Sequence, residues 1–379
     1  MIDRDFMEKK YGLKERPFKD RIARETWIET WTNREKQVEQ WNRVIDDSVN
    51  SPNANYITFI IGDYGQGKSL SLMKIAKTAK GKKEILPIRL NFKSEEKAKK
   101  PGLDFVFRIF KSIDFEKLRI DKNSNINNAI KNIPVKFDEA RKVIIKIMSG
   151  EKDMSDLASY FIRGEIELNK SQLKDFGIIR KIDSLDIGKE YLIAFLAFIK
   201  ELGYTTLLLA IDEFEYLFSL VTKSQQNIYL ALLRGLYDIT ADYEIPDNTI
   251  ANMVFFIAIS EDGWTYLNDL EKKERSSGGP VNPLLRRIDE KVTLEPFDKN
   301  QTKELIQNRL RCNRASGSFD DQPLIPFKDD FVDFIFEETK GVLEKIIVRC
   351  DHVLDAGVAE RIPLLDRDFA ERVLRERGF

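Results

Sequence analysis

The chain has 379 residues, which is room for about two or three domains and a sizeable buried core. It is 42% hydrophobic and 33% charged, and its net charge of −1 gives no overall basic field that would indicate nucleic-acid binding. Cys312, Cys350 and the single His352 have no metal or redox spacing, and the first residues contain no apolar signal core. These features predict a cytoplasmic protein with reduced thiols and no membrane span.

The first 50 residues are polar, and we expect them to form helices in pieces that lead into the first domain. The run Thr32-Asn33-Arg34-Glu35 is followed by apolar residues at helical spacing, which indicates the start of a helix. Trp27, Trp31 and Trp41 lie in the same region. Packing into a core is the favoured interpretation of all three.

The stretch from Tyr56 to Lys80 predicts a strand, a glycine-rich loop and a helix in succession. Tyr56–Ile61 has the composition of a buried strand, and the next residues fit the pattern G-x-x-x-x-G-K-[ST]. Backbone N–H groups of such a loop converge on phosphate oxygens at the start of the helix. We therefore expect Lys68 to reach the β- and γ-phosphates of ATP, and the Ser69 hydroxyl to hold Mg²⁺. The predicted nucleotide-binding residues here are Gly62, Asp63, Tyr64, Gly65, Gln66, Gly67, Lys68, Ser69 and Leu70.

A long helical region separates the second and third predicted strands. Glu84–Leu90 predicts the second strand. The lysine-rich stretch Lys93–Lys100 predicts a solvated loop, with nucleic-acid contact as the alternative. Helical patterns over residues 103–187 are too long for an ordinary connection in an α/β unit, so we expect an inserted helical subdomain. Gly188–Leu202 predicts one more apolar helix before the third strand.

A pair of carboxylates follows the third predicted strand, Thr205–Ile211, which is a continuous apolar run. Asp212 stands where a carboxylate of a P-loop ATPase contacts Mg²⁺ through water. Glu213 stands where a general base polarises the attacking water. The structural alternative is an acidic strand end that caps the next helix, but the upstream phosphate-binding loop favours the functional interpretation.

Three polar residues lie near the last two predicted strands. Ser260 directly follows the predicted strand Met253–Ile259, and we expect its hydroxyl to hydrogen-bond the γ-phosphate or the attacking water. The alternative is that Ser260 only begins the next loop. Arg286 and Arg287 precede a last strand at Val292–Leu294. Arginines at this place would act on the nucleotide of a neighbouring subunit, with surface salt bridges as the alternative.

The end of the chain carries only helical patterns, so strands give way to helices near Phe297. We expect a helical lead-in over residues 1–50, an α/β domain over 51–297 with a parallel sheet flanked by helices, and an all-helical lid over 298–379. The predicted lid helices are Lys299–Cys312, Asp329–Thr339, Val342–Val358 and Asp366–Arg377.

The motifs resemble, in their order, those of an AAA+ ATPase. The resemblance implies a P-loop sheet with a helical lid, and it assigns Walker A to residues 62–69, Walker B to 207–213 and a sensor-1 role to Ser260. The segment Gly341–Lys345 is similar to the Gly-x-x-Arg segment that carries sensor 2, with Lys345 as its basic residue. Arg34 falls where related initiator and transposition ATPases have an arginine-acid pair.

A narrower resemblance is to the P-loop proteins of BREX phage-defence systems, the BrxC/BrxD family. It rests on Phe161-Ile-Arg-Gly164, Leu173-Lys-Asp-Phe-Gly177, and Leu202-Gly203-Tyr204 followed by LLLAIDEFEYL. Origin-recognition and Cdc6-type ATPases and transposition ATPases are more distant relatives.

The resemblance implies a Mg²⁺-dependent ATPase that forms homo-oligomers and acts on DNA or is recruited to it, with phage defence as one setting. Because an arginine would come from a neighbouring subunit, we expect hydrolysis to depend on assembly. One alternative is a STAND-like switch that holds ATP or ADP, turns over slowly and changes partners. Another is a loader that binds a protein partner such as a helicase or a second defence-system component.

Overall fold

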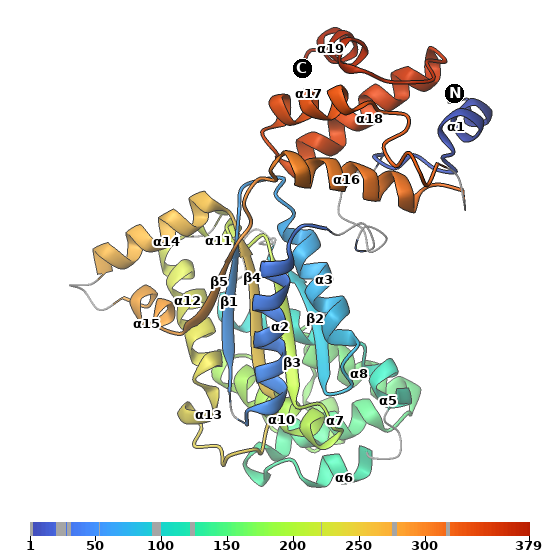
Figure 1. Ribbon diagram of the computed structural model, residues 1–379. Coiled ribbons are helices and arrows are strands. Elements are labelled where there is room, and N and C mark those ends of the chain that lie inside the picture. Colours follow the sequence, from blue (N-terminus) through green and yellow to red (C-terminus); the bar gives the residue numbers. More distant parts are fainter. Residues whose placement is uncertain are drawn as a thin grey trace. The chain divides into compact units, whose positions relative to one another are not determined.

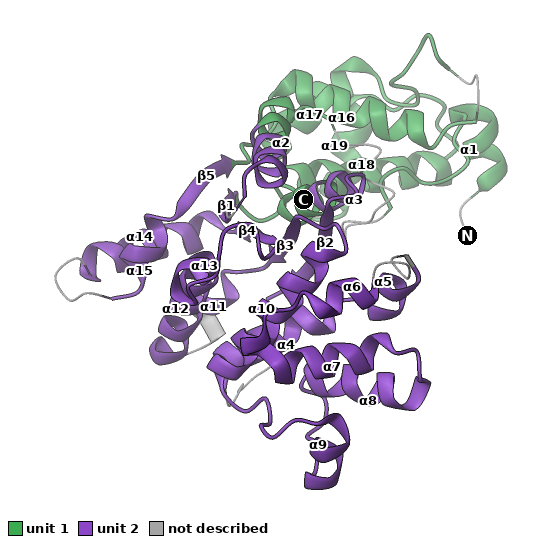
Figure 2. Ribbon diagram, turned by 90° about the horizontal axis from the view of Figure 1, so that it is seen from below, with its two compact units in different colours: residues 1–39, 62–74, 293–379 green, residues 40–61, 75–292 purple. Residues whose placement is uncertain are grey.

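The computed structural model describes residues 3–19, 28, 32–52, 54–92, 100–121, 126–220, 222–274, 279–315 and 319–379. The predictions for Trp27, Trp31 and most of the lysine-rich stretch lie outside these ranges. The chain forms two compact units (Figure 2). We call Met1–Glu39, Gly62–Lys74 and Thr293–Phe379 the lid unit, and Gln40–Ile61 and Ile75–Val292 the sheet unit.

The sheet unit is built on strands in the spatial order β2-β3-β4-β1-β5 (Figure 1). The pairs β1–β4, β3–β4 and β2–β3 are all parallel. Strands β1, β3 and β4 are almost entirely buried, as expected for parallel strands covered on both faces. The predicted α/β class is therefore confirmed. The strands are Tyr56–Ile61 (β1), Ile85–Asn91 (β2), Thr206–Asp212 (β3), Asn252–Ile259 (β4) and Ile288–Thr293 (β5).

Helices fill the connections between these strands, and the predicted helical insertion lies between β2 and β3. This connection, which we call the insertion from here on, also includes the apolar helix predicted after residue 187. It contains α4 (Pro101–Lys111), α5 (Phe115–Asp121), α6 (Ile126–Lys131), η3 (Val135–Phe137), α7 (Asp138–Met148), α8 (Lys152–Ile162), α9 (Lys170–Phe176) and α10 (Leu185–Glu201). The later connections contain α11 (Tyr216–Leu220), α12 (Lys223–Tyr237), α13 (Ile239–Asp242), α14 (Glu261–Glu274) and α15 (Val281–Leu285). Helices α2 (Glu35–Asn50) and α3 (Lys68–Lys80) flank β1 in the chain.

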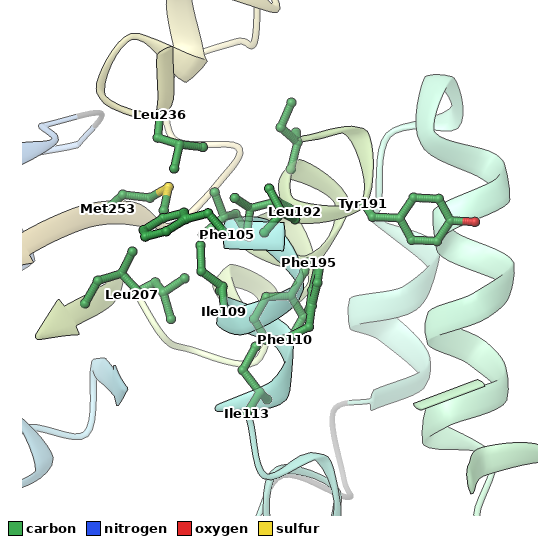
Figure 3. Packing of buried hydrophobic residues seen from close by; sticks show 14 of the residues in the cluster. Phe105, Ile109, Phe110, Ile113, Tyr191, Leu192, Phe195, Leu207, Leu236 and Met253 are labelled. Atoms are coloured by element: carbon green, nitrogen blue, oxygen red, sulfur yellow. The ribbon is translucent and has the colours of Figure 1, made fainter. Parts of the chain in front are cut away.

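The insertion and the sheet share one hydrophobic core (Figure 3). Helix α10 is buried along most of its length, as expected for a helix that is apolar on every face. The rings of Phe110 and Phe195 pack edge to face, with their centroids 5.8 Å apart. Phe105 of α4, Leu207 of β3 and Met253 of β4 belong to the same cluster (Figure 3). The insertion is therefore anchored on the sheet through α4 and α10.

The lid unit combines both ends of the chain in a second hydrophobic core. Its helices are α1 (Arg4–Tyr11), α16 (Lys299–Cys312), α17 (Asp329–Thr339), α18 (Leu343–Ala359) and α19 (Arg367–Glu376). Tyr11 is wholly buried and its hydroxyl donates to the Ile362 carbonyl. Arg16 forms ion pairs with Asp351 at 2.8 Å and Asp355 at 2.6 Å, both on α18. The N-terminal segment is thus held by lid helices.

Strand β5 and helix α14 are two of the elements that differ from the prediction. Strand β5 begins at Ile288 and ends at Thr293, where the sequence pattern predicted Val292–Leu294. The charged run Asp289-Glu290-Lys291 lacks the apolar composition from which a strand is predicted. Such charges are compatible with β5 because it is an edge strand. Helix α14 was not predicted, because its polar sequence has a weak apolar face with only Gly263 and Leu267 buried.

Within the described ranges, no helix has both the length and the apolar composition to cross a membrane.

Candidate functional site

The predicted phosphate-binding loop lies in the lid unit, between β1 and α3. Gly65 and Gly67 have φ angles of 81° and 93°, a region that favours glycine, and they let the loop curl back on itself. The Lys68 ammonium donates to the carbonyls of Gly62 at 2.8 Å and Asp63 at 3.2 Å. Because an ammonium has three donors, one remains for a ligand after it has closed the loop.

The other residues of the loop divide into exposed and buried groups. Asp63 and Tyr64 are exposed, Tyr64 by 84%, whereas Gln66 and Leu70 are buried. Helix α3 starts at Lys68, so the first N–H groups of this helix have no intrahelical acceptor. Such a helix start, with its positive dipole end, is an anion-binding site. The loop therefore fits the phosphates of a nucleotide.

Two oxygen donors on the chain suit a magnesium ion. The Ser69 hydroxyl is half-buried and makes no hydrogen bond among the described residues. Asp212 accepts the Glu213 N–H on one carboxylate oxygen, at 3.0 Å, and its other oxygen has no partner within the same described ranges. Mg²⁺ prefers oxygen ligands and is commonly held by one or two protein groups together with phosphate oxygens. The chemistry of each of these two oxygen donors, taken by itself, fits Mg²⁺.

The first turn of lid helix α18 contacts the phosphate-binding loop. The Glu344 N–H donates to the Gly65 carbonyl at 3.0 Å. A Cβ atom at Gly65 would lie 2.8 Å from the Glu344 Cβ, and one at Gly67 would lie 2.9 Å from Leu343 Cδ2. Lys345, predicted as the basic residue of this segment, is exposed. The residue that lies against the loop is instead Glu344.

A pocket beside the loop holds a buried arginine. Arg34 is 6% exposed, its guanidinium lies 4.6 Å from the centre of the Phe297 ring, and its Nη2 has no hydrogen-bond partner among the residues that the structure describes. Burial lowers the pKa of Arg34 to about 10, against the opposing charge of Glu295. The Phe297 N–H also donates to the Gly341 carbonyl at 2.9 Å. The pocket is lined by Thr32, Arg34, Gln66, Gly67, Leu70, Phe297, Leu305, Arg309 and Leu343.

The predicted catalytic carboxylates lie at the end of β3 in the sheet unit. Glu213 has a φ of 58°, a left-handed conformation that costs free energy in a non-glycine residue. The neighbouring strand β4 fixes this turn, because the Phe214 N–H donates to the Ala258 carbonyl at 3.2 Å. The Phe92 N–H donates to the Asp212 carbonyl at 2.9 Å. Backbone contacts from both neighbouring strands thus hold the two carboxylates in place.

Ser260 follows β4 at the same end of the sheet. Strands β3 and β4 are parallel neighbours, so their carboxyl ends share an edge. The Ser260 oxygen accepts the Gly263 N–H at 3.1 Å, which caps helix α14. Its hydroxyl proton remains available to donate, so the capping role and the predicted sensor role are compatible.

The two predicted arginines have different environments. Arg287 is held by residues of the same chain: its Nε lies 2.8 Å from Asp238 Oδ1, its Nη2 lies 2.7 Å from Asp238 Oδ2, and its Nη1 donates to the Pro283 carbonyl. The Asp238 carboxylate raises the pKa of Arg287. The Arg286 side chain is exposed and makes no ion pair or hydrogen bond with any described residue. Only Arg286 is free to act elsewhere.

Three features of this geometry escaped the sequence. The contact of Glu344 with Gly65 and the clamp of Asp238 on Arg287 join residues far apart in the chain. The stacking of Arg34 on Phe297 does so as well. Of Glu344, Asp238 and Arg34, only Arg34 carried a signal in the sequence, because of its position just before a predicted helix.

The strand order and the P-loop that opens α3 are those of an AAA+ P-loop ATPase. Within this class, the chain belongs to the family described as BREX system ATP-binding protein BrxC/D, whose profile matches residues 114–312, just over half of the chain. It is an ATP-binding protein of that family.

Comparison with solved structures agrees with this fold. The chain is similar to the ORC2 protein of Aeropyrum pernix, solved as ADPNP and ADP complexes, with a TM-score of 0.53 and 13% identity over 92% of this chain and 68% of that one. It is also similar to Cdc6p from Pyrobaculum aerophilum, with a TM-score of 0.49 and 14% identity over 98% and 71% of the two chains. At 13% identity, the likeness to the ORC2 protein concerns the fold alone.

One curated relative is an uncharacterized HTH-type transcriptional regulator, MJ0774, of Methanocaldococcus jannaschii. It is 23% identical over 96 residues, which are 25% of this chain and 23% of that protein. The matched part of this chain thus spans about a quarter of the relative's length.

Proposed function

We propose that this protein hydrolyses ATP in a Mg²⁺-dependent reaction. The observation that carries the proposal is the backbone of Glu213, held in the left-handed region directly after a buried parallel strand. Strained non-glycine residues cluster at functional sites, where the surrounding structure imposes the conformation. A carboxylate that follows Asp212 in such a turn suits a general base.

Each predicted residue has a role in this proposal. The backbone of Gly62–Ser69 and the Lys68 ammonium would bind the phosphates. Ser69 and Asp212 would hold Mg²⁺, which supplies positive charge for the phosphate oxygens when it is bound. Glu213 would accept a proton from the attacking water, and Ser260 would donate a hydrogen bond to the γ-phosphate or to that water.

We further propose that Arg286 acts on the nucleotide of a neighbouring subunit in a homo-oligomer. Its side chain is exposed and unpaired among the described residues, whereas Arg287 is held by Asp238. Arg287 would position the loop that carries Arg286. Hydrolysis would then require assembly, because an isolated subunit lacks the arginine that stabilises charge on the transferred phosphoryl group.

Membership of the BrxC/D family supports phage defence in the cytoplasm as the setting. DNA and a protein partner, such as a helicase or another defence component, are the proposed macromolecular partners. The net charge of −1 means that any DNA contact would rest on a local basic surface.

The contact between α18 and the phosphate-binding loop favours a second candidate. A lid segment that rests on Gly65 and Gly67 suits a nucleotide-dependent switch, in which the bound nucleotide sets the lid position and turnover is slow. This STAND-like function uses the same binding residues and differs in its rate and in its response to DNA.

The test is an ATP hydrolysis assay with and without single- and double-stranded DNA, combined with mass photometry on the same samples. We expect DNA to accelerate turnover, Glu213→Gln to lower turnover by about 10²–10³-fold, and ATP to drive Glu213→Gln into multimers. Slow turnover that ignores DNA, in a particle that stays monomeric, would contradict the DNA-acting ATPase and favour the switch. Turnover that Glu213→Gln leaves unchanged would exclude the assigned base.

A further inference from the structure

The start of lid helix α18 places an acidic side chain beside the phosphate-binding loop. Glu344 contacts Gly65 through its backbone N–H, and a Cβ at Gly65 would lie 2.9 Å from the Glu344 carboxylate oxygen Oε2. Val342 lies next to the same glycine, with its Cγ1 3.4 Å from that Cβ position. The carboxylate is therefore adjacent to the loop and not merely on the same helix.

The Glu344 carboxylate has no compensating cation in the part of the chain that the structure describes. It makes no hydrogen bond or ion pair there, although it is half-buried. The loop's own cation, Lys68, donates to Gly62 and Asp63. Lys345, the next residue along the lid, is exposed. A negative charge thus stands uncompensated beside a loop whose chemistry suits anions.

We propose that Glu344 determines which nucleotide the site prefers, by disfavouring a triphosphate relative to a diphosphate. The proposal rests on the phosphate-binding role proposed for Gly62–Ser69. A third phosphate adds negative charge to the ligand, and like charges a few ångströms apart in partly buried surroundings repel appreciably. ATP would therefore bind at the cost of loosening the contact between Glu344 and Gly65, whereas ADP would leave that contact largely in place.

Two other roles for Glu344 make opposite predictions. An acidic residue in the first turn of a helix is stabilised by the helix dipole, and a purely structural Glu344 would not affect nucleotide preference. A carboxylate that ligated Mg²⁺ would instead favour the triphosphate, and only when the metal is present.

The experiment measures dissociation constants of ADP and of a non-hydrolysable ATP analogue, each with and without Mg²⁺, by calorimetry on the full chain. In Glu344→Gln we expect the ratio of the analogue's dissociation constant to that of ADP to fall by about tenfold, with the larger fall in the absence of Mg²⁺. The matched control is Glu338→Gln, which removes an equal charge from an exposed position on α17 of the same lid. This control should leave the ratio unchanged.

A second measurement follows the lid directly. Amide hydrogen exchange over residues 342–346 should be faster with the ATP analogue than with ADP in the unmodified protein, and equal in Glu344→Gln. Two results in Glu344→Gln would overturn the inference: an unchanged affinity ratio, or a weaker affinity for the ATP analogue that is seen only in the presence of Mg²⁺. In both cases the protein would still bind nucleotide. If the unmodified protein bound neither nucleotide, the proposed phosphate-binding role would fail as well, so the two failures are distinguishable.

Discussion

The phosphate-binding loop and the carboxyl ends of β3 and β4 supply chemistry in different ways. The loop offers backbone N–H groups and one ammonium, and its shape depends on Gly65 and Gly67. The strand ends offer side chains, Asp212, Glu213 and Ser260, held by hydrogen bonds between neighbouring strands. Under the proposed function, the first region would bind the nucleotide and the second would act on it. Changes in the first should therefore alter affinity, and changes in the second should alter rate.

The largest expected effect belongs to the rate side of this comparison. Arg286→Ala should lower kcat by about 10³-fold, because an arginine that reaches a transferring phosphoryl group from a neighbour contributes roughly that much. Nucleotide affinity should stay within about twofold, because the proposed role of Arg286 is to stabilise charge that develops during phosphoryl transfer. Steady-state hydrolysis at saturating ATP, with calorimetry for affinity, provides the measurement.

Arg287→Ala is the informative partner of that variant. Loss of the clamp on Asp238 should destabilise the fold by about 1–3 kcal/mol, since a half-buried carboxylate loses its charged hydrogen bonds. Arg286→Ala should leave the melting temperature unchanged. If Arg286→Ala kept full turnover while Arg287→Ala lost it without a loss of stability, the two assignments would have to be exchanged.

The affinity side of the comparison is tested at Lys68. Lys68→Ala should weaken ADP and ATP binding by about 10–100-fold, the value of a charge-assisted hydrogen bond together with the closure of the loop. Lys74→Ala removes the same charge further along α3 and should leave affinity unchanged. Titration with a fluorescent nucleotide measures both. If Lys68→Ala kept full nucleotide affinity but lost turnover, Lys68 would contribute to the rate of hydrolysis and not to nucleotide affinity.

The sequence could predict the elements whose signal is local. The strand–loop–helix around Gly62–Ser69, the apolar run before Asp212 and two of the lid helices, Lys299–Cys312 and Asp329–Thr339, were predicted from contiguous residues, and the structure has those elements. The α/β class followed because buried parallel strands have a continuous apolar composition.

The tertiary contacts that give two adjacent residues different environments could not be predicted from the sequence. Arg286 and Arg287 are the same residue type at adjacent positions, and only the approach of Asp238 from α12 and α13 separates them. Glu344 and Lys345 are likewise adjacent, and the helix phase of α18 decides which one meets Gly65. Tertiary packing fixes such choices, and a single sequence does not contain it.

The smallest expected effect concerns Arg34, which lies in the pocket beside the loop. Its guanidinium is buried on Phe297, and its Nη2 has no hydrogen-bond partner within the described ranges, so we expect this charge to add little to the stability of the ligand-free protein. We expect Arg34→Met, which keeps the length and the packing, to weaken nucleotide binding by about tenfold and to leave the melting temperature of the ligand-free protein unchanged or higher. Arg43→Met, at an exposed position on α2, controls for the loss of charge and should change neither value. A lower melting temperature with unchanged affinity would show that Arg34 serves the packing of the lid unit and contributes nothing to the ligand. In that case nucleotide affinity would depend on Gly62–Ser69 alone. The contrast would then lie between these loop residues, which set affinity, and the strand-end residues, which set rate.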